Sequence, residues 1–304
     1  MGEWSLKFIS EENFTNHVMA TIEKYGEKLD SYDIKKFNSN TIDPIKMIFD
    51  KTVYQTSWEE MIGNEIYRQR DKANNNDIGY FHQRIFQYFN NCRVPENGKE
   101  GGWDVIYHDD NGIALPDGDI VHTVYVEMKN KHNTMNSAAA GKTYIKMQNQ
   151  LLNDDDCACF LVEAIAKKSQ NIKWETTVDG KKVSHKRIRR VSIDQFYGIV
   201  TKEDDAFFQM CMVLPKVIEK AVSQELDNKI PHDTVLDELR RIADSTGEKS
   251  EDIAMAIAIY LLGFSTYKGF PDLAGSITNF EQREQELLQR LYMYAKAYSG
   301  YRPE

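Results

Sequence analysis

The run Thr123-Val124-Tyr125-Val126-Glu127-Met128-Lys129 has the strongest β-strand character in this chain. It consists largely of β-branched and aromatic residues, which favour the extended conformation. Side chains alternate between the two faces of a strand, so Val124 and Val126 share an apolar face. Glu127 and Lys129 lie together on the opposite face. The run therefore predicts a strand that buries one side and presents a carboxylate beside an ammonium group on the other.

Two other β-like runs lie on either side of this strand in the sequence. Residues 103–107 follow a Gly-rich polar loop and have the pattern of a strand, and residues 157–165 are apolar enough for a central strand. A helix that opens at Asn136 or Ser137 and runs to about Asn153 lies before the last of these strands. The order strand, strand, helix, strand predicts an α/β fold with a mixed central β-sheet flanked by helices.

The remaining apolar spacing is mostly helical. One helix is predicted over 11–29 and another from Pro44 onward. Ser57 and Glu60 have the spacing of a capping box and mark a further helix start. A helical pattern also covers 78–89. Breaks or turns are predicted at three polar segments, 74–77, 109–112 and 116–118.

The last third of the chain differs from the rest because its pattern is helical throughout. Breaks are predicted near Pro231, Gly247 and residues 269–271. We therefore expect an α/β core at 1–205, which includes residues up to the third strand and beyond, and a helical region at 206–304. The helical region either belongs to the same domain or forms a dimer interface.

Charge is distributed unevenly. The net charge is −9, which argues against a protein that coats nucleic acid without specificity. Residues 167–190, however, contain nine Lys or Arg and two acids. Within this window, two β-like runs flank Asp179-Gly180, and Gly accepts the positive φ of a tight turn. The sequence thus predicts a basic β-hairpin at about 170–191 that is suited to contact phosphates.

The four cysteines, Cys92, Cys157, Cys159 and Cys211, form no Cys-x-x-Cys pair and do not have the spacing of a zinc site. Cys157 and Cys159 share one face of a strand, so we expect them to be small core residues. The N-terminus lacks the layout of a secretory signal, and the apolar runs are too short to cross a bilayer. These features favour a cytoplasmic protein.

Asp104 lies 23 residues before Glu127 and near the start of the preceding strand. If the two strands pair as a hairpin, both carboxylates converge at one end. Two neighbouring carboxylates repel each other, and a divalent cation such as Mg²⁺ relieves the repulsion. The metal polarises a phosphate and helps to generate hydroxide, while Lys129 orients water or stabilises developing charge. The alternative is that Glu127 and Lys129 form a solvated ion pair on an exposed sheet face.

The arrangement of Asp104, Glu127 and Lys129 resembles the nuclease superfamily with a Pro-Asp…(Asp/Glu)-x-Lys signature, with Trp103 at the position where Pro is frequent. The chain also resembles, over about residues 5–220, the type II restriction endonucleases that cut at GGNCC or GGWCC sites. The runs that carry this second resemblance are 78–83, 102–105, 126–134 and 184–197.

This resemblance implies a restriction-endonuclease-like core, Mg²⁺ as the cofactor and double-stranded DNA as the substrate, with 5′-phosphate ends. A two-fold symmetric site calls for a two-fold symmetric protein, so we expect a homodimer. A restriction enzyme also functions with a cognate DNA methyltransferase that protects the host DNA. The alternatives are a repair or junction-resolving nuclease of the same superfamily, and a non-catalytic DNA-binding protein.

Three residues on the preceding helices have supporting roles in this interpretation. Superfamily nucleases often have an acidic residue there, which makes Glu65 a candidate metal ligand; the alternative is a surface acid beside Arg68. His82 and Gln83 are polar residues in an otherwise apolar helix. They either support the active site or pack with internal hydrogen bonds.

Candidate DNA contacts fall in two segments. The first follows the catalytic strand and is alternatively a polar loop that caps the next helix; it comprises Lys131, His132, Asn133, Thr134 and Asn136. The second is the basic arm of the hairpin, whose cations have no opposing acid nearby in the sequence; it comprises Lys181, Lys182, Lys186, Arg187, Arg189 and Arg190. The alternative for this arm is an exposed basic strand edge.

Overall fold

The computed structural model describes residues 4–27, 31–96, 98–225, 232–245 and 249–264. The chain divides into two compact units. One unit contains residues 1–27 and 74–227, and the other contains 28–73 and 228–304. Helix α4 (Trp58–Arg84) contributes residues to both.

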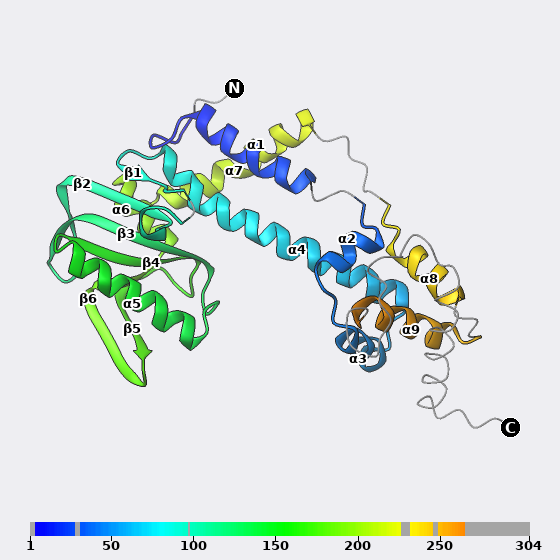
Figure 1. The fold of residues 1–304 in the computed structure, drawn as a ribbon. Helices are drawn as coiled ribbons and strands as arrows, with labels where there is room; N and C mark the ends of the chain where they lie inside the picture. The colour runs from blue at the N-terminus through cyan, green and yellow to red at the C-terminus, as the bar shows by residue number, and fades with distance from the viewer. Residues whose placement is uncertain (1–3, 28–30, 97, 226–231, 246–248, 265–304) are drawn as a thin grey trace. The chain divides into compact units, whose positions relative to one another are not determined.

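The first unit is built on a six-stranded sheet with the order β1-β2-β3-β4-β6-β5 (Figure 1). β3 pairs in parallel with β4, and β4 with β6, whereas the other pairs are antiparallel, so the sheet is mixed as predicted. The strands are β1 (Cys92–Arg93), β2 (Val105–Ala114), β3 (Ile120–Lys131), β4 (Cys157–Ile165), β5 (Asn171–Val178) and β6 (Lys181–Ser192).

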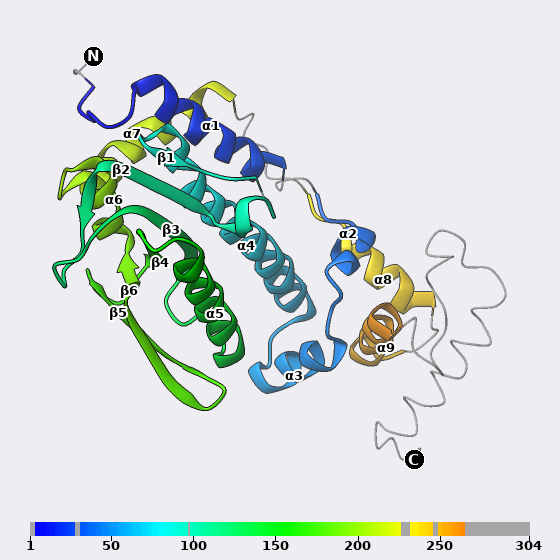
Figure 2. The ribbon, with the colours of Figure 1, turned by 60° about the vertical axis from the view of Figure 1, so that its left-hand side comes forward.

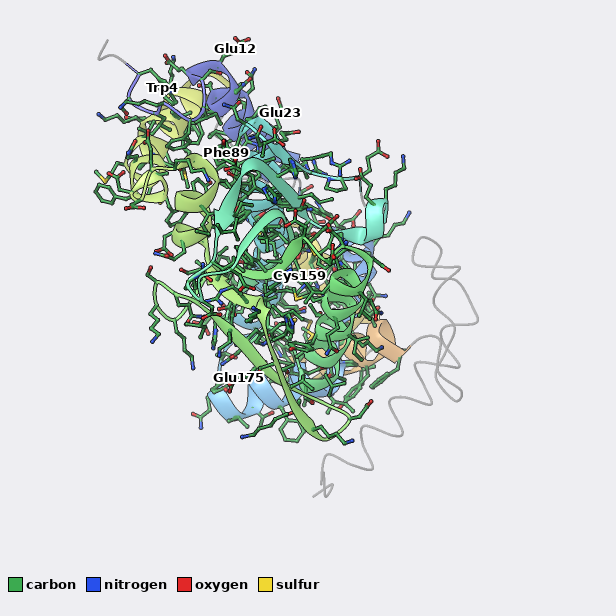
Figure 3. The ribbon with its side chains drawn as sticks, turned by 90° about the vertical axis from the view of Figure 1, so that its left-hand side faces the viewer. Trp4, Glu12, Glu23, Phe89, Cys159 and Glu175 are labelled. Atoms are coloured by element: carbon green, nitrogen blue, oxygen red, sulfur yellow. The ribbon has the colours of Figure 1, made fainter. Side chains whose placement is uncertain are left out.

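Helices cover both faces of this sheet (Figures 1 and 2). Val105, Val124 and Val126 face one side, in a core shared with α1, α6 and α7. Ile106 and Leu161 face the other side and pack with α5. Figure 3 labels one residue from each core, Phe89 on the first side and Cys159 on the second. The helices of this unit are α1 (Glu11–Glu27), the end of α4, η1 (Ile85–Tyr88), η2 (Glu100–Gly102), α5 (Ser137–Asn153), α6 (Ile193–Thr201) and α7 (Ala206–Glu225).

The second unit is helical and has a core of its own. Arg70 and Asp233 join its two sequence segments through an ion pair of 2.7 Å, and Asp233 also accepts a hydrogen bond from the Tyr32 N–H. Its elements are α2 (Ile34–Ser39), α3 (Pro44–Tyr54), the first part of α4, α8 (Val235–Ser245) and α9 (Glu251–Phe264).

Local signals predicted several element boundaries correctly. Ser57 and Glu60 form the expected reciprocal capping box at the start of α4. Asn136 caps α5, accepting a hydrogen bond of 2.9 Å from the Ala139 N–H. Asp179 and Gly180 both have positive φ at the turn between β5 and β6, which confirms the hairpin. The turn at 116–118 is also present, closed by a hydrogen bond from Gly118 N–H to the Leu115 carbonyl.

Two predicted breaks are wrong. The polar segment 74–77 does not interrupt α4, because the helix penalty of a few Asn residues is below about 1 kcal/mol each and contacts in the fold offset it. One such contact is a hydrogen bond of 3.1 Å from the Asn130 side chain to the Asn75 carbonyl. Segment 109–112 forms an irregularity within β2 instead of ending it, since β3 pairs with the strand on both sides.

The boundary predicted after residue 205 differs from the two units of the structure. α7 packs on α1 and α6, and so residues 206–227 group with the sheet. The breaks predicted near Pro231, Gly247 and 269–271 lie outside the described residues. Among the helices that the structure describes, none has the length and apolar character that crossing a membrane requires.

Candidate active site

Asp104 and Glu127 meet at one end of the β2–β3 pair. The strands run antiparallel with Val105 opposite Val126, which confirms the predicted hairpin. Asp104 immediately precedes this pair on one strand and Glu127 follows it on the other. The backbone N–H of Asp104 donates to the Val126 carbonyl at 2.9 Å, so the first acid is tied to the strand that carries the second.

The Asp104 carboxylate is held by two donors. The backbone N–H of Met128 donates to Oδ2 at 2.6 Å, and the Gln83 side chain donates to Oδ1 at 3.1 Å. Burial raises the pKa of Asp104 above its usual value, and the Glu127 charge adds to the rise; the Met128 N–H and the nearby lysines oppose it. A buried acid with a raised pKa beside a second acid is typical of a functional site.

Each carboxylate oxygen of Glu127 forms an ion pair with a lysine. Lys129 Nζ lies 2.7 Å from Oε1, and Lys146 Nζ lies 2.9 Å from Oε2. Burial opposes the ionisation of Glu127, but the hydrogen bonds and charges of the two lysines outweigh it. The pKa of this carboxyl therefore lies below its usual value.

Lys146 belongs to α5 and was not selected by sequence reasoning. Besides Glu127, its ammonium group donates to the Gly102 carbonyl at 2.7 Å and lies 4.0 Å from the centroid of the Trp103 ring. Nothing in the local pattern of α5 marks this lysine. Only the parallel β3–α5–β4 connection, which folds α5 back over the sheet, brings it to the acids.

A cleft of about 550 Å³ opens beside these residues. Asp104 and Lys129 lie on its wall, and most of the other lining groups are polar. They come from the end of α4, from β3 and from β4, and comprise Asn75, Asn76, Gly79, Tyr80, His82, Gln83, Met128, Asn130 and Ala164. The cleft therefore gives access from solvent to one carboxylate and one ammonium group of the site.

Of the two polar residues predicted to support the site from α4, Gln83 contacts Asp104 directly. His82 lines the cleft, and its Nδ1 is buried with no hydrogen-bond partner among the described residues. Burial, reinforced by the charge of nearby His17, lowers the pKa of His82 to about 4. His82 is therefore a neutral imidazole at neutral pH.

The segment after β3 is partly anchored. His132 Nδ1 lies 3.0 Å from Glu163 Oε2, and Arg190 Nε donates to Glu163 Oε1 at 2.8 Å. Glu163 is only 1% exposed, so the Arg190 guanidinium and the His132 ring supply the polar partners of a buried carboxylate. Asn136 acts as the cap of α5, and Thr134 donates to the Lys131 carbonyl at 3.0 Å. Lys131 and Asn133 are exposed.

Four of the six hairpin cations have acidic partners in the fold, although no acid lies near them in the sequence. Lys186 and Arg187 both bind Asp119, at 2.7 and 3.1 Å. Arg189 is buried and binds Asp117 at 2.7 Å, while Arg190 binds Glu163. The acids are distant in sequence and are brought to β6 by the sheet order. Lys181 and Lys182, next to the turn, are exposed.

Glu65 belongs to the second unit, where Arg68 donates to its carboxylate at 2.7 Å and Gln69 at 3.1 Å. The contact with Arg68 is the one that the alternative interpretation expects, although the Glu65 side chain is only 11% exposed. The role of Glu65 as a metal ligand stays a prediction. Within the described ranges, no group of three or more His, Cys, Asp or Glu has the geometry to hold a metal ion. Cys157 and Cys159 are buried free thiols, as predicted.

Comparisons with known proteins identify the family of this chain. The family model of the Eco47II restriction endonuclease matches residues 6–223. The type II restriction enzyme Sau96I of Staphylococcus aureus is 31% identical over 223 residues, which cover 70% of this chain and 80% of that enzyme. The type II restriction enzyme Eco47II of Escherichia coli is 29% identical over 232 residues, covering 73% and 90%. The matches confirm the family that the motifs around Glu127 indicate: this chain belongs to the Eco47II restriction endonuclease family.

Proposed function

We propose that this site-specific DNA endonuclease hydrolyses both strands of DNA at a short site of the GGNCC type, with Asp104, Glu127 and Lys129 as its catalytic residues. The observation that carries the proposal is the meeting of these three groups at one end of β2 and β3, beside a polar cleft. The family and the type II relatives support the reaction class.

Enzymes of this class generally need a divalent metal ion, and the residues present fit one. Asp104 and Glu127 are oxygen donors on adjacent strands, and the raised pKa of Asp104, due first to burial and also to the Glu127 charge, reflects the cost of ionising Asp104 in this site. A hard cation such as Mg²⁺ relieves that cost and keeps coordination positions for water and phosphate. When bound, it supplies Lewis-acid polarisation of the phosphate and an activated water.

The protein's own groups prepare this chemistry. Gln83 and the Met128 N–H fix the orientation of the Asp104 carboxylate. The Lys129 side chain is 30% exposed and lies on the wall of the cleft, where its ammonium group can reach a phosphate oxygen or the attacking water. A fixed positive charge there stabilises the negative charge that develops on the phosphorus oxygens in the transition state.

DNA contacts are assigned to the exposed groups around the site. Lys131, Asn133 and Thr134 follow the catalytic strand, and Lys181 and Lys182 lie next to the hairpin turn. His132, Asn136, Lys186, Arg187, Arg189 and Arg190 already have partners in the protein, so any contact they make with DNA competes with those bonds. We also propose a homodimer and a cognate methyltransferase, because a symmetric site requires the first and host protection the second.

The test is digestion of unmethylated DNA in the presence of Mg²⁺, followed by mapping of the ends. We expect discrete fragments with 5′-phosphates from the wild type. Glu127→Gln and Lys129→Met should each reduce the rate by about 100-fold or more. Lys99→Met is the matched control, since Lys99 forms an exposed ion pair with Glu96 and should be dispensable.

Other outcomes would assign another function. Nicks at branched or damaged DNA, without sequence preference, would indicate a repair or junction-resolving nuclease. Tight DNA binding with no cleavage in Mg²⁺ or Mn²⁺ would indicate a non-catalytic DNA-binding protein. Full activity of Glu127→Gln or of Lys129→Met would remove that residue from the active site.

A further inference from the structure

Glu127 has two lysine partners, whereas the proposed reaction uses one. Lys129 is two residues away on the same strand, and its ammonium group donates a hydrogen bond to Glu127 Oε1. Lys146 comes from α5 and occupies Oε2 at 2.9 Å. Both oxygens of a proposed metal ligand are therefore already bound to ammonium groups in the protein without DNA.

The position of Lys146 is well defined by its other contacts. Its Nζ donates to the Gly102 carbonyl, directly before Trp103 and Asp104, and stands over the Trp103 ring. The loop that leads into Asp104 and the carboxylate of Glu127 are thus joined through a single ammonium group. Lys146 nevertheless stays 29% exposed, so an incoming anion can reach it.

An ammonium group in this position opposes cation binding. A charge about 3 Å from a ligand oxygen repels a cation at that oxygen, and partial burial strengthens the repulsion relative to water. Displacing the lysine from Glu127 also breaks a hydrogen bond, which stays broken unless another acceptor replaces Oε2. A phosphate oxygen of bound DNA is such an acceptor. Lysine is suited to bind phosphate because its ammonium group is a compact charge at the end of a flexible side chain.

On the basis of the proposed function, we propose that Lys146 couples cation binding to DNA binding. In the free protein it occupies Oε2 of Glu127 and weakens the affinity for a divalent cation. When DNA enters, the ammonium group moves from Glu127 to a phosphate oxygen, which frees Oε2 for the cation. Because coupling between two ligands is reciprocal, the cation must raise the affinity for DNA by the same factor.

The test measures Ca²⁺ binding by titration calorimetry, first with the free protein and then with a duplex that contains its cleavage site. Lys146→Met should bind Ca²⁺ about 10-fold more tightly than the wild type without DNA, and the further gain on adding the duplex should shrink. Lys142→Met is the matched control, because Lys142 is exposed one turn earlier on α5. Its Ca²⁺ affinity should equal that of the wild type.

Three further variants make every result decisive. Lys146→Gln also removes the charge and should show the same gain in Ca²⁺ affinity, so it replaces Lys146→Met if that variant does not fold. Lys146→Arg keeps the charge and should keep the wild-type affinity. Equal or weaker Ca²⁺ binding by a folded Lys146→Met overturns the coupling. Glu127→Gln tests the site itself: if it binds Ca²⁺ as the wild type does, the proposed metal position fails. If only Glu127→Gln loses binding while Lys146→Met gains none, the coupling alone fails.

Discussion

Asp104 combines a raised pKa with one hydrogen bond to each carboxylate oxygen. Burial, with the Glu127 charge adding to it, disfavours the ionised carboxylate in the folded protein. The unfolded chain ionises near the ordinary pKa of an Asp, so folding stability falls as the pH rises from that value through the raised pKa of the folded state. At neutral pH the ionised residue therefore costs stability.

We accordingly expect Asp104→Asn to melt at a higher temperature than the wild type at pH 7 without metal, while cleavage is lost. The amide oxygen still accepts from the Met128 N–H, and the Gln83 side-chain amide must turn its oxygen toward the new NH₂ group to keep the second bond. Thermal unfolding followed by circular dichroism measures the difference. It should shrink at a pH low enough to protonate Asp104. A lower melting temperature at pH 7 would show that the carboxylate stabilises the fold.

His82 has the opposite pH dependence. Burial, with His17 nearby, lowers the pKa of His82 to about 4. As the pH falls, His82 is therefore protonated near pH 6.5 in the unfolded chain but only near pH 4 in the folded protein. Stability is therefore lost as the pH falls from about 6.5 to about 4, by roughly 3 kcal/mol. His82→Phe should reduce this loss in urea unfolding experiments. His232→Phe is the control, since His232 is 84% exposed. An unchanged profile for His82→Phe would contradict the assignment.

At the scale of elements, the β5–β6 hairpin divides into two parts. Near the turn, Lys181 and Lys182 are exposed, whereas Arg187 and Arg189 bind Asp119 and Asp117, which precede β3. Only the first pair is available to DNA without breaking protein contacts. In the basic arm, Lys181 and Lys182 are therefore candidates for DNA contacts, whereas Arg187 and Arg189 stabilise the sheet through ion pairs.

The Lys181→Ala/Lys182→Ala double variant should bind DNA more weakly without loss of stability. If each lysine contacts one phosphate, the slope of log affinity against log salt should fall by about 2. Arg189→Ala, by contrast, should unfold at lower urea concentration, because it leaves Asp117 and Asn171 without this partner. Fluorescence anisotropy over a salt series measures the slope. The same slope in the double variant and the wild type would exclude both lysines from the interface.

The elements themselves were largely predictable from sequence. The period-two pattern at 123–129, the apolar run at 157–165 and the Asp-Gly turn each mark a feature that the structure contains. Polar runs were less informative, because the segment 74–77 has weak helix propensity but lies inside α4. Propensities of that size are smaller than the tertiary contacts that oppose them.

At the scale of the whole molecule, sequence reasoning predicted that Asp104, Glu127 and Lys129 lie close together, but it did not predict the groups around them. Asp104, Glu127 and Lys129 were predictable because hairpin pairing and strand alternation are local rules. Lys146 and Glu163 were not, since their contacts depend on the parallel β3–α5–β4 connection and on the position of β6 in the sheet. The second unit was missed for the same reason. It joins segments 28–73 and 228–304, and no local pattern encodes that pairing.

The β2–β3–α5 connection has a consequence for how such enzymes diverge. The acids and both lysines of the proposed site lie on one uninterrupted stretch, from Asp104 to Lys146, whereas Lys181 and Lys182 belong to a later hairpin. Substitutions near the turn between β5 and β6 do not alter the groups of the proposed active site. A descendant can therefore change how tightly it holds the DNA backbone while it inherits the groups of the proposed reaction as a single block.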